Sequence, residues 1–125
     1  MTKEKFLSKD ELGKLGEELA TNHLLNHGYS ILTRNYQFRK AEVDIIAEKN
    51  SGLVFIEVKT RSSYFMSEPE HTVTMKKQRQ IIKASNAYIR ENDLENESRF
   101  DIITIVVDGD EHKLAHLENA FYPTL

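Results

Sequence analysis

Two acidic residues and a lysine have the residue types and the spacing that metal chemistry needs. Asp44 lies in one run that alternates between polar and apolar residues, and Glu57 and Lys59 lie two apart in the next run. Alternation at a period of two predicts two strands, which the short polar connection 49–52 would join. Residues of equal parity share one face of a strand, so Glu57 and Lys59 are expected to leave their strand on the same side.

The length of the connection predicts which residues of the two strands lie opposite each other. A four-residue loop, or a two-residue loop at Asn50 and Ser51, places Asp44 opposite Glu57 and Glu42 opposite Lys59. Like charges directly opposite each other destabilise a sheet, and a cation bound between the two carboxylates would offset that cost. The alternative is that both carboxylates lie on an exposed face and extend into water.

A first helix is predicted as far as His27, with a capping box at Ser8–Glu11 and with Gly28 in the left-handed conformation that ends it. Glu17 lies at the edge of its apolar stripe. Three of the residues around it are small: Gly13, Gly16 and Ala20. Two glycines inside a helix cost roughly 1 kcal/mol each relative to alanine, so close packing on a sheet is a reason for them. From the pattern alone, a solvated surface charge is the favoured interpretation of Glu17.

A second helix is predicted from Thr74 to Glu91, after the irregular segment Ser62 to Thr74. Three cations crowd its first turns, where the helix dipole disfavours positive charge: Lys76, Lys77 and Arg79. Helix stability therefore does not account for them, and together with the backbone amides they would suit a bound phosphate. The alternative is that they are ordinary surface cations. Gln78 lies on the helix row that is expected to face the sheet.

The remaining segments complete an α/β fold. Tyr29 to Tyr36 predicts a strand before the hairpin, and Arg99 to Val107 predicts a buried strand, because it is apolar on both faces. His112 to Leu117 predicts a short edge strand. The predicted order is therefore α-β-β-β-α-β with a further short strand, a mixed central sheet flanked by helices, in a single domain over residues 1–125.

Four histidines and one aspartate are interpreted as structural or surface residues. His23 and His27 are four apart on the first helix, but no third ligand accompanies them, so a surface position is expected. His112 and His116 share parity on a strand and have no acidic partner in the surrounding sequence. Asp101 is interpreted as an anchor for the nearby Arg99.

Composition excludes several classes of protein. The 125 residues contain no cysteine, which removes disulfides, thiolate zinc sites and cysteine nucleophiles. The formal net charge of −3 argues against nucleic-acid binding through overall basicity, so any such binding needs a local basic patch. No apolar run resembles a signal peptide or a membrane span, so a cytoplasmic protein without membrane contact is expected.

Phe121 and Tyr122, near the end of the chain, are expected to dock on the core or on a second subunit of a homodimer.

Several of these segments resemble motifs of a known group. Ala41-Glu42-Val43-Asp44 followed by Glu57-Val58-Lys59-Thr60-Arg61 is similar to the D…E-x-K signature of the PD-(D/E)XK nuclease superfamily. With Gly16-Glu17 and Arg99-Phe100-Asp101 added, the pattern resembles the bacterial YraN-type family over about residues 13–121. One difference is Ala41, where that family usually has glycine.

The resemblance implies a restriction-endonuclease-like fold and hydrolysis of phosphodiester bonds in nucleic acid, with DNA, structured or branched, as the expected substrate. Asp44 and Glu57 would hold Mg²⁺ or Mn²⁺, with Glu17 binding the ion directly or through water. Lys59 would orient the attacking water and stabilise the developing charge. The nucleic-acid-binding residues would be Arg61, Lys76, Lys77 and Arg79, with Gln78 positioning substrate or water as a glutamine or lysine near this place does in related nucleases.

Two other classes of function remain open from the sequence. A module with a nuclease fold could bind nucleic acid or a protein partner without cutting anything, because a fold does not determine an activity. A metal-binding regulatory domain would need the two carboxylates but would not need Lys59. A carboxylate pair beside a lysine favours the enzyme, since a pure binding module has no use for that combination.

Overall fold

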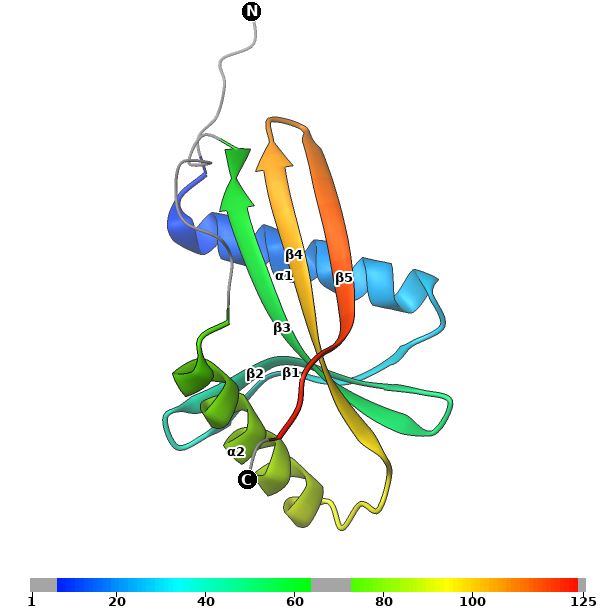
Figure 1. Cartoon of the computed structure of the whole chain (residues 1–125). Helices are drawn as coiled ribbons and strands as arrows, with labels where there is room; N and C mark the ends of the chain where they lie inside the picture. Colours follow the sequence, from blue (N-terminus) through cyan, green and yellow to red (C-terminus); the bar gives the residue numbers. More distant parts are fainter. Residues whose placement is uncertain (1–6, 64–72, 124–125) are drawn as a thin grey trace, which may run out of the picture.

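The computed structural model describes residues 7–63 and 73–123 of the chain. Within this part, two helices and five strands follow one another in the predicted order (Figure 1). They are α1 (Lys9–Asn26), β1 (Ser30–Phe38), β2 (Ala41–Lys49), β3 (Gly52–Ser62), α2 (Met75–Glu91), β4 (Ser98–Asp108) and β5 (Glu111–Phe121). The last strand has 11 residues, so the prediction of a short strand was wrong. Most of the predicted irregular segment, residues 64–72, lies outside the described residues.

The five strands form one mixed sheet in the order β1-β2-β3-β4-β5. Only β3 and β4 run parallel, and the other neighbours are antiparallel. Parallel neighbours need a long crossover connection, and α2 lies in the connection between these two strands. The prediction of an α/β fold with a mixed sheet and flanking helices is therefore confirmed.

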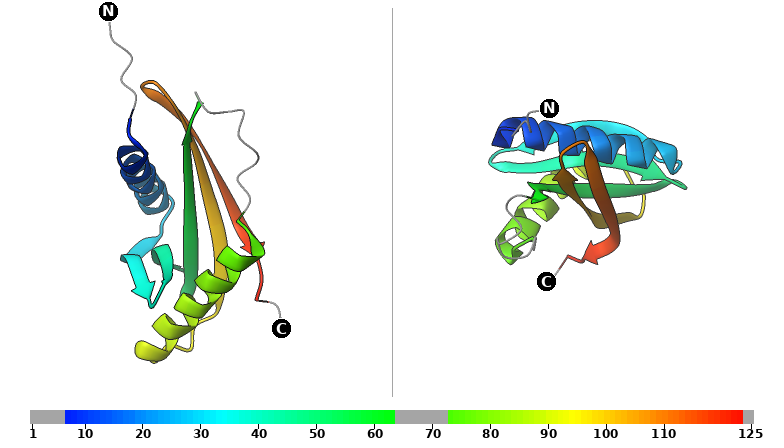
Figure 2. Two further views of the ribbon diagram at one scale, coloured as in Figure 1. Left: turned by 90° about the vertical axis from the view of Figure 1, so that its left-hand side faces the viewer. Right: turned by 90° about the horizontal axis from the view of Figure 1, so that it is seen from above.

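The sheet separates two apolar layers, one under each helix (Figure 2). Alternate residues of β3 supply both layers: Val54 and Ile56 pack with Ala20 and Leu24 of α1, whereas Leu53 and Phe55 pack with Ile81 and Ala84 of α2. Burial on both faces explains the apolar runs in these strands, at residues 53–56 of β3 and 102–107 of β4, where Thr104 is the one polar residue. Glu57 continues the parity of Leu53 and Phe55, so it leaves β3 on the side of α2.

The hairpin between β2 and β3 has the predicted register. Lys49 pairs with Gly52 and Ile46 pairs with Phe55. The two loop residues, Asn50 and Ser51, have φ angles of 51° and 66°, which is the geometry of a type I′ turn. A two-residue loop therefore sets the alignment of the two strands.

The pairing of β2 with β3 ends earlier than predicted, at Ile45 and Ile56. The expected backbone pairs Asp44–Glu57 and Glu42–Lys59 are not formed, and β2 continues beside β1, where Glu42 pairs with Gln37. Val43 also departs from the predicted alternation, since it packs in the layer under α2, whereas Ile45 lies in the layer under α1. The strands thus separate at the point where the candidate residues lie.

Helix α1 begins and ends as predicted. Ser8 and Glu11 form the capping box, with hydrogen bonds of 3.1 and 2.9 Å between side chain and backbone. Gly28 follows the helix with a φ of 85°. Between these ends Gly16 lies directly against the side chain of Thr60, where a β-carbon would collide. This close approach confirms close packing on β3 as the reason for Gly16, whereas a β-carbon at Gly13 would meet no atom within 4 Å, so the same expectation was wrong for Gly13.

Phe121 ends β5 inside the layer under α2, whereas Tyr122 is exposed. Phe121 therefore docks on the core as expected, and for Tyr122 the alternative of a second subunit stays a prediction. In the part of the chain that the structure describes, neither helix has the length and apolar character needed to cross a bilayer.

Candidate functional site

The two carboxylates lie together where β2 leaves β3. Asp44 accepts a 2.8 Å hydrogen bond from the backbone amide of Val58, so its side chain takes the place of a backbone partner on β3. Glu57 is only 4% exposed. Burial raises the pKa of Asp44 to about 8, with hydrogen bonding to and repulsion from Glu57 as the next causes. The side chains are therefore close although their backbones do not pair.

Two lysines flank this carboxylate pair. The Nζ atom of Lys59 lies 4.0 Å from Oε2 of Glu57, and the Nζ atom of Lys77 lies 3.7 Å from the same oxygen. Lys59 follows Glu57 on β3, whereas Lys77 reaches the pair from the first turn of α2. Lys77 also lowers the pKa of Asp44, against the larger effect of burial. The structure therefore places Lys77 beside Glu57.

Glu17 approaches the pair from the opposite helix. Burial raises its pKa, and repulsion from Asp44 adds to the shift, so the two carboxylates are close enough to interact. The pKa is lowered by a hydrogen bond with Asn35 and by the charge of Arg34, whose Nη2 atom lies 3.7 Å from Glu17. Arg34 also donates a 2.9 Å hydrogen bond to the neighbouring Glu18. Glu17 is thus half-buried rather than a fully solvated charge.

Asn35 is a contact that the sequence analysis missed. It has a φ of 53°, a conformation that asparagine adopts more readily than most residues. It lies in β1, in which a register shift occurs between Ile31 and Thr33. An asparagine inside a predicted strand was the available signal, because asparagine is rare in regular strands.

The carboxylate pair is the set of side chains in this site that could hold a divalent metal ion. Among residues 7–63 and 73–123, no three acidic, histidine or cysteine side chains come close enough to hold one ion. Mg²⁺ commonly uses one or two carboxylates and keeps several waters, so a two-residue set meets its needs. Oε2 of Glu57 is buried and accepts no hydrogen bond, although two ammonium groups lie within 4.0 Å of it, and burial followed by the proximity of Glu57 raises the pKa of Asp44. Both features fit a divalent cation bound between the two side chains.

The predicted phosphate-binding residues do not form one group. Lys76 and Arg79 are exposed on the outer side of α2, whereas Lys77 turns toward Glu57. Gln78 donates a 3.0 Å hydrogen bond to the carbonyl of Val73, which precedes the helix. Arg61 is half-buried near the end of β3. The side-chain amide of Gln78 is therefore engaged at the start of its own helix.

A second polar cluster surrounds Asp101, which is 0% exposed. Arg99 donates to it from Nε at 3.0 Å, which confirms the predicted anchor. His116 lies 2.7 Å from its Oδ2 atom, so the interpretation that His116 lacks an acidic partner was wrong. His23 lies 3.1 Å from the other ring nitrogen of His116 and is half-buried, so a purely surface position was also wrong. The pairing of β4 with β5 brings His116 beside Asp101, and the local sequence does not show this pairing.

Comparison with known proteins assigns most of the chain to one protein family. The model of the uncharacterised protein family UPF0102 matches residues 16–105. A UPF0102 protein of Flavobacterium johnsoniae is 50% identical over 117 residues, which cover 90% of this chain and 95% of that protein. A relative from Flavobacterium psychrophilum is 48% identical over 113 residues, with the same coverage. One from Alkaliphilus oremlandii is 42% identical over 114 residues, or 89% of this chain and 97% of the relative. The chain therefore belongs to the UPF0102 family, the YraN-type group that its motifs resemble.

Proposed function

We propose that this protein is a metal-dependent nuclease of the PD-(D/E)XK type, built on a restriction-endonuclease-like core. The observation that carries the proposal is the pair of half-buried Asp44 and buried Glu57, with Lys59 beside it, at the separation of β2 and β3. A fold gains nothing in stability from two adjacent carboxylates that are shielded from water, since loss of solvent disfavours each charge and each disfavours the other. Such a pair is better explained by a ligand that it binds.

Each residue then has a chemical role. Asp44 and Glu57 would hold Mg²⁺ or Mn²⁺, and Glu17 would bind the ion through water. When bound, the ion would supply Lewis-acid chemistry that lowers the pKa of a water and polarises a phosphoryl group. Lys59 lies two residues after Glu57 on the same strand and is about one-third exposed, so its ammonium can meet both a water and a phosphate oxygen. It orients the attacking water and stabilises the charge that develops on the phosphate.

The backbone also contributes to positioning. The amide of Val58 fixes one oxygen of Asp44, which leaves the other oxygen available for the metal. Gly16 holds α1 against Thr60 and thereby sets the distance of Glu17 from the pair. A preorganised set of ligands costs little reorganisation when the substrate binds. The tight helix packing and the separated strands thus serve the same site.

One observation favours a second candidate, a nuclease-fold module that binds nucleic acid or a protein partner without cutting. The ammonium of Lys77, 3.7 Å from Glu57, supplies positive charge to the pair in place of a metal. A carboxylate pair that a lysine neutralises needs no metal ion and would have a structural role only. The two candidates differ in what happens when a divalent metal and a nucleic acid are added.

A cleavage screen separates them. Branched, single-stranded and duplex DNA and RNA, end-labelled, are incubated with the wild-type protein in Mg²⁺ or Mn²⁺ beside Glu57→Ala. The nuclease proposal expects metal-dependent products from at least one substrate with the wild type and none with the variant. Intact substrates in every reaction, together with retained binding, would support the non-cutting module.

A further inference from the structure

Helix α2 carries positive charge that the carboxylate site does not use. It has five cationic residues and one acidic residue, Glu91, in a chain whose formal net charge is −3. Its first turn contains no acidic residue. Only Lys77 among the five turns toward the carboxylate pair. The other four cations therefore need a separate explanation.

These four cations and one asparagine lie on a single face, which we call the α2 stripe. Its members are Lys76, Arg79, Lys83, Asn86 and Arg90, and all five are exposed. Their steps of three and four residues keep them within an arc of about 80° around the helix axis. The stripe is about 21 Å long, at 1.5 Å for each residue. It is thus a continuous cationic line rather than a scatter of surface charges.

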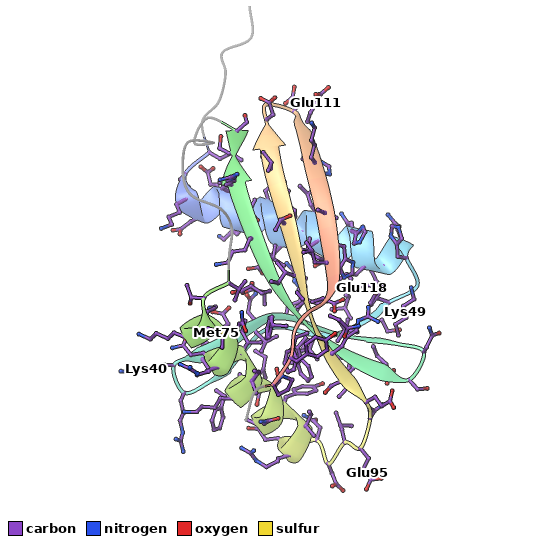
Figure 3. The ribbon with its side chains drawn as sticks, in the orientation of Figure 1. Lys40, Lys49, Met75, Glu95, Glu111 and Glu118 are labelled. Carbon is purple, nitrogen blue, oxygen red and sulfur yellow. The ribbon has the colours of Figure 1, made fainter. Side chains whose placement is uncertain are left out.

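Within the part of the chain that the structure describes, the side chains of the stripe have no polar partner. None of its five side chains forms an ion pair or a side-chain hydrogen bond with another residue of the described ranges. Four of them, with Ile82, border an open hollow of about 270 Å³. Figure 3 shows α2 on the outside of the molecule, running from Met75 toward Glu95. Cations left unpaired in an acidic protein indicate an anionic partner from outside.

We propose that the α2 stripe binds the phosphate backbone of a nucleic acid over about six base pairs, the length that 21 Å covers at 3.4 Å per base pair. The choice of partner rests on the proposed function, because Lys77, next to Lys76, contacts Glu57 and so joins the stripe to the carboxylate pair. The nucleic-acid strand that reaches the carboxylate pair then extends along α2, on one side of that pair. The hollow between Arg79 and Arg90 receives backbone atoms and no base edge, so binding is independent of sequence.

An anionic membrane fits this surface less well. Helices that bind at a membrane interface insert an apolar face among the lipids. The apolar face of α2, with Ile81 and Ala84, is buried against the sheet and cannot be inserted. An acidic protein segment would satisfy the charge, but it would not explain why the stripe begins at the carboxylate pair.

The test measures binding without cleavage. Fluorescence anisotropy with a labelled DNA duplex of about 20 base pairs, and with an RNA duplex of equal length, is recorded in EDTA at several salt concentrations. The variant is Lys83→Ala with Arg90→Ala, at the end of α2 away from the carboxylates. The matched control is Lys14→Ala with Lys113→Ala, two exposed cations on α1 and β5 that remove the same charge. Circular dichroism verifies that both variants fold.

The slope of log K against log salt is negative, and the stripe proposal expects its magnitude to decrease by about 1.8 in the variant, from two lost phosphate contacts at 0.9 each, and to stay constant in the control. Equal slopes in the variant and the control would overturn it. So would a variant that loses binding to vesicles rich in anionic phospholipid, or to poly-glutamate, while its nucleic-acid binding is unchanged. Because EDTA removes the metal, stripe binding can hold when cleavage fails, and cleavage can hold when the stripe fails.

Discussion

The backbone amide of Val58 donates a 2.8 Å hydrogen bond to the carboxylate of Asp44 at the point where β2 separates from β3. In a continuous antiparallel pair that amide would bond to a backbone carbonyl. The carboxylate replaces the carbonyl as the acceptor for this amide, and this contact brings Asp44 beside the buried Glu57. The separation of the strands is therefore what assembles the two acidic groups.

Divalent metal should stabilise the fold through this pair. Mg²⁺ or Mn²⁺ at 100 times its dissociation constant would add about 2.7 kcal/mol to the free energy of unfolding, because only the folded state holds both ligands. Thermal denaturation with and without metal measures the shift in Tm. Glu57→Gln, of nearly equal size, should abolish the shift. An identical Tm for the wild type in millimolar metal and in EDTA would count against the site.

The pair also predicts how stability depends on pH in the absence of metal. The pKa of Asp44 is about 8 in the folded state and has its ordinary, much lower value in the unfolded state. The folded protein therefore holds a proton that the unfolded chain releases. This contribution to stability is complete below about pH 4 and is lost as the pH rises through about 8.

Urea unfolding in EDTA across this pH range tests that prediction against Asp44→Asn. The asparagine keeps an oxygen for the amide of Val58 but does not titrate. The difference in the free energy of unfolding between the variant and the wild type should widen in favour of the variant as the pH rises from 4 to 8, by several kcal/mol at most. A constant difference would mean that Asp44 does not hold the proton.

Two glycines of α1 provide a matched test of the close packing. Gly16→Ala places a β-carbon against Thr60 and should destabilise the fold by about 1–3 kcal/mol, as overpacking does. Gly13→Ala meets no atom within 4 Å, so it should stabilise the helix by roughly 0.5–1 kcal/mol. Chemical denaturation measures both. Adding Thr60→Ala to Gly16→Ala should recover part of the loss, and equal effects of the two glycine substitutions would refute the packing argument.

Lys77 should stabilise the metal-free protein and become dispensable when metal is bound. Its ammonium, 3.7 Å from Glu57, is the nearest positive charge to that carboxylate among the described residues. Lys77→Met should therefore lower Tm in EDTA, and saturating Mg²⁺ should remove most of the difference from the wild type. Lys76→Met, one residue earlier and exposed, is the control. A deficit for Lys77→Met that is the same with and without metal would show that it acts only as a structural charge.

Much of the fold could be predicted because local signals agreed with one another. The capping box at Ser8, the glycine at position 28 and the loop of Asn50 and Ser51 each fix a boundary through their own backbone geometry. The alternation of β3 gave the correct register with β2 as far as Ile56. These features depend on neighbours in the sequence, which a sequence displays directly.

The arrangement of the candidate site depended on contacts between distant segments. The length of the hairpin loop correctly predicted that Asp44 lies near Glu57. It also predicted a backbone pair between them, whereas the two strands separate at this point. Lys77 was grouped with Lys76 by proximity in the chain, although a rotation of 100° around the helix sends them in different directions. His116 reaches Asp101 only through the pairing of β4 with β5. No local pattern encodes these meetings.

The central claim is that Asp44, Glu57 and Lys59 form a metal-dependent phosphodiesterase site, and the single-turnover cleavage rate of Lys59→Met beside the wild type tests it most directly. Methionine keeps the length of the side chain and removes its charge, so metal binding, followed by the Tm shift, should persist. The predicted result is metal-dependent cleavage by the wild type and a rate lower by a factor of about 10² or more in the variant. Cleavage by Lys59→Met at close to the wild-type rate, or a wild type that cuts no nucleic acid in Mg²⁺ or Mn²⁺, would contradict the mechanism.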